Sequence, residues 1–215
     1  MTASFIPNCK KCKRMIWREK LQFIILISLL SAMLLPLAAH AEGNIQIKSV
    51  SLAAAGDGYE ISVDSEIVLN ATLEEALEKG IVLYFVTKFT LVDSRWYWFD
   101  KEVARTKPRV GLTYHALTRR YRLNYRTYSR NFYSLEEALQ VLGQLRDHPI
   151  TIKSELKPDV DYKAELRVWL DLTRMPKPFQ MKALGSSDWN LSSDRLEWYM
   201  KLPLSTRPFH LKGGG

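Results

Sequence analysis

Apolar and polar residues alternate over most of the chain beyond residue 44, and a period of two predicts β-strands with one buried face. The clearest example is residues 161–172, where five apolar side chains fall on one side of the predicted strand: Tyr162, Ala164, Leu166, Val168 and Leu170. The same reading predicts further strands at about 45–52, 59–69, 111–130, 150–156 and 195–203. Residues 81–92 are apolar at neighbouring positions, which predicts a central strand covered on both faces.

Two short segments have the residue spacing of a helix instead. Each begins with a capping box, in which a hydroxyl side chain and a glutamate three residues later satisfy the first free amide groups of the helix. Thr72 and Ser134 begin these two boxes and are the predicted N-caps. We expect the first helix to stop at Gly80 and the second to end at Pro149.

Eight or nine strands with two short connecting helices predict an all-β fold. An immunoglobulin-like antiparallel β-sandwich agrees best with strands of this number and length. A β-barrel is the alternative architecture. A domain of this size buries about 70% of its unfolded surface, so it needs no disulfide or metal ion to hold its core.

The start of the chain has the pattern of an export signal. Residues 21–39 are almost wholly apolar, and they follow six lysines and arginines and precede the small residues of Ala39-His40-Ala41. This pattern is typical of a secretory signal peptide. We therefore expect a signal peptide at 1–41, one β-sandwich domain at 42–205 and a flexible tail at 206–215, in a periplasmic or secreted protein. The alternative is an uncleaved leader that anchors the protein in the inner membrane, because about 19 apolar residues can span a bilayer.

Removal of the leader changes the charge and the cysteine content. The whole chain has a formal net charge of +8, but the leader holds six of the 31 basic residues and one of the 23 acidic ones, which leaves +3. A charge this small does not predict a nucleic-acid-binding protein. Both cysteines, Cys9 and Cys12, also lie in the leader, so the remaining chain can form no disulfide.

Several distinctive motifs resemble those of an exported bacterial family. They are RWYWFD at 95–100, LTRRYRL at 117–123, MPKPFQ at 175–180 and DWNLSSD at 188–194. On these motifs the chain resembles the domain-of-unknown-function family DUF4390 over most of residues 44–203. The resemblance implies a secreted or periplasmic β-rich domain with no assigned activity. It also implies genes that stand beside those of a nitrogen-regulation type sensor kinase and response regulator.

The sequence after the leader contains no familiar catalytic motif. His115, His148 and His210 do not have the spacing of metal ligands, and the motifs of zinc proteases, serine hydrolases and phosphate-binding loops are absent. We therefore expect no enzyme activity, no catalytic or metal-binding residues and no cofactor. A hydrolase whose site forms only in the folded chain is an alternative.

The strongest candidates for a binding site are arginines and tryptophans. In the predicted strand around residues 119–126, a period of two places Arg120, Arg122 and Arg126 on one face, where guanidinium groups suit carboxylate or phosphate partners. The alternative is a solvated face that pairs with acidic residues of a neighbouring strand. Trp96 and Trp98 share one face of a further predicted strand at about 95–103, where they either bind a sugar or a partner or lie under a second layer.

These observations predict a non-enzymatic binding or adaptor protein of the bacterial cell envelope. Its partner is expected to be an envelope protein, and the gene neighbourhood implied by the resemblance links it to two-component signalling. The alternative is a carrier or structural domain that binds an anionic lipid or a glycan. No nucleic acid partner and no membrane span after cleavage of the leader are expected.

Overall fold

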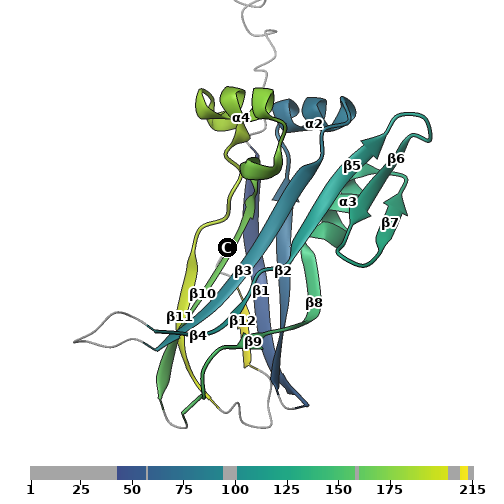
Figure 1. The fold of residues 1–215 in the computed structure, drawn as a ribbon. Coiled ribbons are helices and arrows are strands. Elements are labelled where there is room, and N and C mark those ends of the chain that lie inside the picture. The colour runs from purple at the N-terminus through teal and green to yellow at the C-terminus, as the bar shows by residue number, and fades with distance from the viewer. Residues whose placement is uncertain (1–42, 57, 94–100, 158–159, 203–208, 213–215) are drawn as a thin grey trace, which may run out of the picture. The chain divides into compact units, whose positions relative to one another are not determined.

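The alternating residues form antiparallel sheets in the computed structural model of the protein (Figure 1), which describes residues 43–56, 58–93, 101–157, 160–202 and 209–212. The chain divides into two units, Met1–Ala39 and His40–Gly215, and every described residue belongs to the second. The predicted leader, with its cysteines, therefore lies outside the described residues.

The smaller sheet has four described strands. Their order is β12-β1-β2-β8, with each neighbouring pair antiparallel. The long hairpin of β1 and β2 turns at Gly56, which has a positive φ of 55°. The bounds of the strands are Asn44–Ala55 for β1, Gly58–Val68 for β2, Gln144–Pro149 for β8 and Phe209–Lys212 for β12.

The larger sheet is built around β3, which pairs with β10 on one side and with β4 and β5 on the other. Its main order is β11-β10-β3-β5-β6-β7, and β9 pairs with β4. The bounds of its strands are Leu83–Asp93 for β3, Lys101–Thr106 for β4, Arg109–His115 for β5, Arg120–Asn124 for β6, Ser129–Phe132 for β7, Thr151–Ile152 for β9, Asp161–Leu170 for β10 and Leu196–Lys201 for β11.

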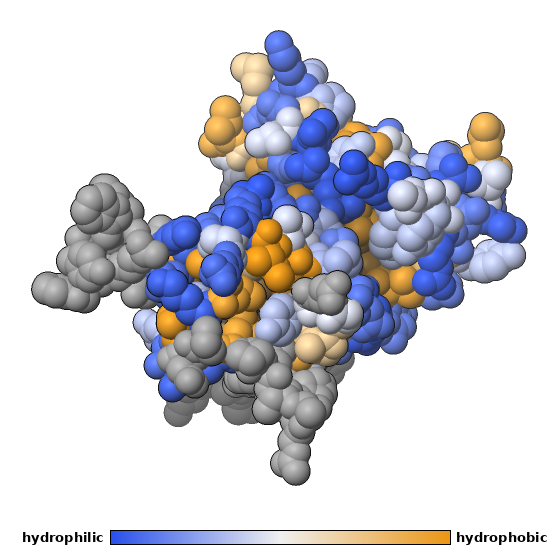
Figure 2. Space-filling model, turned by 60° about the horizontal axis from the view of Figure 1, so that its bottom comes forward, coloured by the Kyte–Doolittle hydropathy of each residue, from blue (hydrophilic) through white to orange (hydrophobic). Residues whose placement is uncertain are grey.

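The two sheets enclose the core, and this confirms the predicted all-β sandwich. The alternation of β10 is also confirmed, because Tyr162, Ala164, Leu166, Val168 and Leu170 are all buried. Tyr162, Ala164 and Leu166 pack with Phe89 of β3 and with Val50 and Ile61 of the smaller sheet. Val168 and Leu170 belong to a second core cluster, with Phe85 of β3 and Ile45 of the smaller sheet. The burial of one large apolar side chain stabilises a fold by about 1.5–3 kcal/mol. Figure 2 shows hydrophilic side chains over most of its view, with apolar ones in smaller areas among them.

Three α-helices and two short 3-10 helices complete the described structure, where two helices were predicted. Helices α2 and α4 lie together at one end of the sheets, and α3 lies beside β6 and β7 (Figure 1). Helix α4 begins within the Pro176-Lys177-Pro178 segment, because proline is tolerated in the first turn of a helix. The bounds are Ala71–Glu78 for α2, Leu135–Leu142 for α3, Lys177–Leu184 for α4, Leu172–Arg174 for η1 and Ser187–Trp189 for η2.

The predicted helix starts are half correct. Ser134 is the N-cap of α3, and its side chain accepts a hydrogen bond from the backbone N–H of Glu137 at 3.1 Å. Thr72 is not the N-cap of α2, because the helix begins at Ala71. Asn70 caps it and accepts from the N–H of Leu73 at 2.9 Å. An asparagine fills this position as well as a threonine does.

Two boundary predictions need correction. Helix α3 ends at Leu142, not at Pro149, because Gly143 brings the chain onto β2 and the next residues pair with that strand as β8. The flexible tail predicted at 206–215 is wrong for Phe209–Lys212, which pair with β1 as β12. Both changes add a strand to an edge of the smaller sheet.

Gly143 is required by a close approach of α3 to β2. The N–H of Ser65 donates to the carbonyl oxygen of Gly143 at 2.9 Å, and a Cβ atom at Gly143 would overlap with the carbonyl oxygen of Ser65. A side chain at this position must therefore push the helix away from the strand.

We expect Gly143→Ala to lower the free energy of unfolding by about 1–3 kcal/mol, as other overpacked sites do. Gly185→Ala is the matched control, because Gly185 is also the C-cap of an eight-residue helix, and its Cβ would lie 3.8 Å from its nearest neighbour. That variant should change the free energy by less than about 1 kcal/mol. Equal urea midpoints for the two variants would contradict this account of Gly143.

Candidate functional site

One face of the larger sheet is free of the sandwich core. Leu166, Val168 and the other buried residues of β10 occupy the inner face, so the residues between them point to the opposite side, which we call the outer face. Strand register places Lys88 opposite Arg167 and Arg109 opposite Val86. The outer face continues across β5 onto β6, where Arg122 is opposite Thr113. Several cations therefore share one sheet surface.

Neutral partners hold the two arginines of β6 in place. The Nε–H of Arg122 donates to Oδ1 of Asn131 at 2.9 Å, and an Nη–H of Arg120 donates to the hydroxyl of Tyr133 at 3.0 Å. The Arg120 guanidinium also lies 4.5 Å from the centroid of the Tyr133 ring. Among the described residues neither arginine forms an ion pair, so both retain an uncompensated positive charge.

The structure separates the residues predicted for this site. Arg120 and Arg122 share one face of β6, as the alternation predicts. Arg126 is not in the same row, because β6 ends at Asn124 and the chain bends at Arg126, whose side chain is exposed. Trp96 and Trp98 lie outside the described residues.

Large exposed side chains accompany the two arginines in the turns at the ends of β6 and directly after β7. The exposed fractions are 103% for Leu117, 56% for Tyr128 and 77% for Tyr133. The ring of Tyr128 stacks on that of Tyr125 with centroids 4.4 Å apart, which fixes its orientation. We call Leu117, Arg120, Arg122, Tyr128 and Tyr133 together the arginine–tyrosine surface.

An ion pair connects the middle of the outer face to the turn after β10. Nη2 of Arg109 lies 2.9 Å from Oδ2 of Asp171, and Oδ1 of Asp171 accepts from the hydroxyl of Thr173 at 2.6 Å and from its N–H at 3.2 Å. Burial acts to raise the pKa of Asp171, but the Thr173 hydrogen bonds and the charges of Arg109 and Lys107 outweigh it and hold the pKa below its ordinary value. The Asp171 carboxyl group is therefore ionised near neutral pH.

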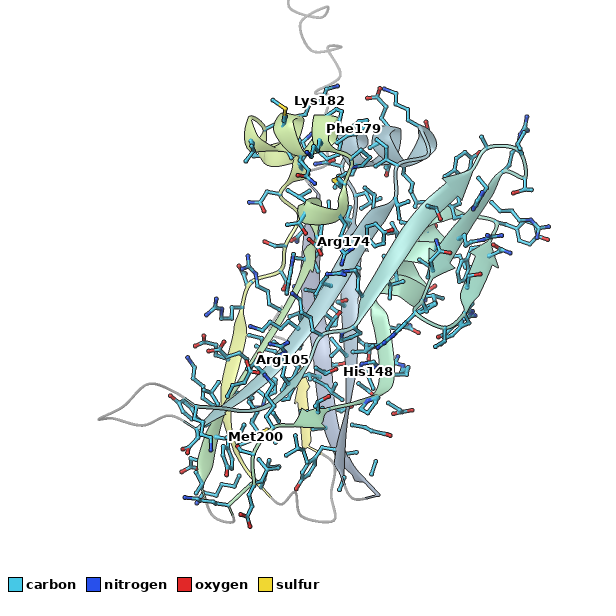
Figure 3. The ribbon with its side chains drawn as sticks, in the orientation of Figure 1. Arg105, His148, Arg174, Phe179, Lys182 and Met200 are labelled. Atoms are coloured by element: carbon cyan, nitrogen blue, oxygen red, sulfur yellow. The ribbon has the colours of Figure 1, made fainter. Side chains whose placement is uncertain are left out.

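On the outer face near β11 and β4, acidic side chains pair with the cations and neutralise their charge. Nζ of Lys163 lies 2.9 Å from a carboxylate oxygen of Glu197 and 3.4 Å from one of Glu165. On β4, Arg105 (Figure 3) lies opposite Thr90 and 3.8 Å from a carboxylate oxygen of Glu102. Positive charge without an acidic partner is thus found at β6 and at Lys88 and Arg167.

The histidines do not form a common site in the described structure. His115 is exposed at the end of β5 in the larger sheet, whereas His148 (Figure 3) is half-buried on β8 in the smaller one. Burial lowers the pKa of His148, so its ring is neutral near pH 7. Within the described ranges, no three His, Cys, Asp or Glu side chains are grouped so that they could hold a metal ion.

The fold and its outer face define a β-sandwich domain with a cationic sheet surface. The model of the family described as a domain of unknown function, DUF4390, matches residues 42–199. The chain belongs to this family, and the resemblance inferred from the sequence motifs is confirmed. Neither the curated proteins nor the solved structures contain a match to the chain. A search of the described residues for membrane spans finds no helix of sufficient length and hydrophobicity.

Sequence reasoning did not find the neutral partners of the arginines. Tyr133 follows β7 and Asn131 lies within it, so their contacts with β6 depend on a strand pairing that periodicity alone does not give. The facing of Lys88 and Arg167 across β3 and β10 was missed for the same reason. A pairing of these two strands in the correct register would have revealed it.

We expect Asp171→Asn to lower the free energy of unfolding at pH 7 by about 1–3 kcal/mol, because the variant leaves the Arg109 guanidinium without its counter-ion. The folded-state pKa of Asp171 is depressed, so the stability it contributes is present above its unfolded pKa and is lost as the pH falls through the folded value. Urea unfolding of parent and variant should therefore converge below about pH 4.

Asp161→Asn is the control for this prediction, because Asp161 is exposed at the start of β10, the strand that Asp171 follows, and has no ion pair within the described structure. It should leave stability at pH 7 nearly unchanged. A constant difference between parent and Asp171→Asn from pH 7 down to pH 3 would contradict the assigned role of the charge.

Proposed function

We propose that this protein is a non-enzymatic binding or adaptor protein of the bacterial cell envelope, and that it binds an acidic protein partner through the arginine–tyrosine surface. The observation that carries the proposal is how the guanidinium groups of Arg120 and Arg122 are held and charged. Their guanidinium groups are oriented by Tyr133 and Asn131, and neither group forms an ion pair among the described residues. Oriented and uncompensated arginines are suited to bidentate bonds with carboxylates.

The neighbouring side chains favour a protein over a lipid or a glycan. Arginine and tyrosine are enriched at the centres of protein interfaces, where a few such residues supply most of the binding energy. Tyr128 and Tyr133 are held by contacts with Tyr125 and Arg120, so little conformational freedom is lost when a partner covers them. The exposed Leu117 adds apolar area in the turn before β6.

The cellular setting rests on the sequence. The basic and apolar leader supports export, and the gene neighbourhood implied by the family supports a link to two-component signalling. Adjacent genes are an association, and a link to signalling needs a demonstrated partner. The proposed partner is therefore an envelope protein with an acidic surface, and the crosslinking experiment described next would identify it.

In the test, a photo-reactive amino acid replaces Leu117 in the full-length chain in its native cells. We expect illumination to produce one crosslinked species of defined mass. Arg120→Glu with Arg122→Glu should abolish that species, because the reversed charges repel an acidic partner. The variant should still fold, since both side chains lie on the outer face with neutral partners only.

Arg174→Glu with Lys177→Glu is the matched control. It makes the same change of charge at exposed residues near α4 (Figure 3 labels Arg174) and should leave the crosslinked species intact. A photo-reactive residue at the exposed Met181 should give no such species. Retention of the crosslink after charge reversal on β6, or its appearance from Met181, would refute the proposed surface. A crosslink to lipid or glycan instead of protein would support the carrier alternative.

A further inference from the structure

A hollow of about 230 Å³ lies on the outer face, away from β6. Its floor comes from β3 and β10, with Lys88, Thr90, Arg167 and Trp169 among the lining residues. Its wall is the segment 190–195, which precedes β11. Nothing in the proposed binding of a protein at the arginine–tyrosine surface requires this second site.

Backbone hydrogen bonds fix the wall of the hollow against β10. The N–H of Leu170 donates to the carbonyl oxygen of Leu191 at 2.8 Å, and the N–H of Ser193 donates to that of Val168 at 2.8 Å. The N–H of Val168 donates in turn to the buried hydroxyl of Ser193 at 3.0 Å. The hollow is therefore formed before any ligand arrives, as binding sites for small molecules usually are.

The hollow has an excess of positive charge. Lys88 and Arg167 lie directly opposite each other on paired strands, an arrangement that is unfavourable for like charges. Neither has an ion-pair partner among the described residues, and Arg167 donates only to the hydroxyl of Ser192 at 3.2 Å. The one lining acid, Glu165, is already close to Lys163 and Arg195. An anion between Lys88 and Arg167 would remove their repulsion.

An unsatisfied hydroxyl group provides an independent indication of a ligand. Thr90 is only 5% exposed, and its hydroxyl oxygen is buried without a hydrogen-bond partner. Buried polar groups in native proteins almost always have a partner, so an exception in a cavity wall points to a missing group. Thr90 is next to Lys88 on the same face of β3 and lines the same hollow.

We propose that this hollow binds the phosphate group of a phosphomonoester between Lys88, Arg167 and the hydroxyl of Thr90. The donors favour phosphate over carboxylate, because an ammonium, a guanidinium and the hydroxyls of Thr90 and Ser192 approach from two strands and from the wall. A phosphate presents three strong acceptor oxygens at pH 7, whereas a carboxylate has two in one plane. The organic part of the ester then lies against Trp169, which is half-buried and lines the hollow.

Isothermal titration of the full-length chain with glycerol 3-phosphate tests this site. We expect Lys88→Gln with Arg167→Gln to weaken binding more than about tenfold. The loss of a single charge-assisted hydrogen bond already weakens binding about tenfold. Thr90→Val should weaken binding about threefold to tenfold, because valine has the size of threonine but lacks its hydroxyl donor. Without ligand, the Thr90→Val variant should unfold at the same temperature or higher, since it replaces an unsatisfied polar group.

Arg120→Gln with Arg122→Gln is the control, because it removes two charges from the same sheet face outside the hollow. It should bind glycerol 3-phosphate as the parent does, so failure at one surface is distinguishable from failure at the other. An unchanged affinity in the Thr90 and Lys88/Arg167 variants would overturn the proposal. An equal loss in the control, or acetate that binds as tightly as glycerol 3-phosphate, would overturn it too.

Vesicles show whether the bound phosphate belongs to a lipid headgroup or to a soluble phosphoester. Phosphatidylcholine vesicles that contain phosphatidic acid present a phosphomonoester, whereas those that contain phosphatidylglycerol present a diester. Sedimentation with the former alone, dependent on Lys88 and Arg167, identifies a lipid headgroup as the source. Binding of glycerol 3-phosphate without such sedimentation identifies a soluble phosphoester. The absence of binding to both probes would contradict the site.

Discussion

The packing of the smaller sheet against one face of β3 and β10 is the constraint on which the rest of the structure depends. Leu166 and Phe89 are buried almost completely, and they meet Val50 and Ile61 of the hairpin opposite. Because side chains alternate along a strand, a shift of one residue would bring Arg167 into the core and Leu166 into water. The core therefore fixes the register, and the register in turn fixes which charges face one another on the outer face.

The sequence was sufficient where residues close together in the chain determine the local structure. The alternation in β10 and the cap at Ser134 depend on neighbours in the chain, and both are confirmed. The end of α3 could not be read in the same way. Leu145 keeps the helical spacing of the preceding leucines, but Gly143 allows β2 to approach, and pairing with β2 then converts the next residues into β8. Tertiary contact overrides a helical pattern of this length.

The candidate sites were predictable only in part, because each depends on strands distant in sequence. Alternation alone places Arg120 and Arg122 on one face. The contacts that orient them come from Tyr133 and Asn131, after a turn whose length the sequence does not reveal. The hollow combines β3, β10 and the segment 190–195, which are separated by about half of the chain. The excess of positive charge in the hollow follows from the pairing of β3 with β10, which places Lys88 opposite Arg167.

The outer face uses two different ways to accommodate its cations, and the difference has a functional consequence. Near β11, Lys163 lies close to the carboxylates of Glu165 on its own strand and of Glu197 on β11, so an acidic partner gains little there. Near β6, neutral hydrogen-bond acceptors orient the guanidinium groups without cancelling their charge. Surface ion pairs contribute little to stability, so their absence at β6 costs the fold almost nothing. It leaves a positive potential at one end of the sheet, and under the proposed function this potential would direct an acidic partner to β6 and away from β11.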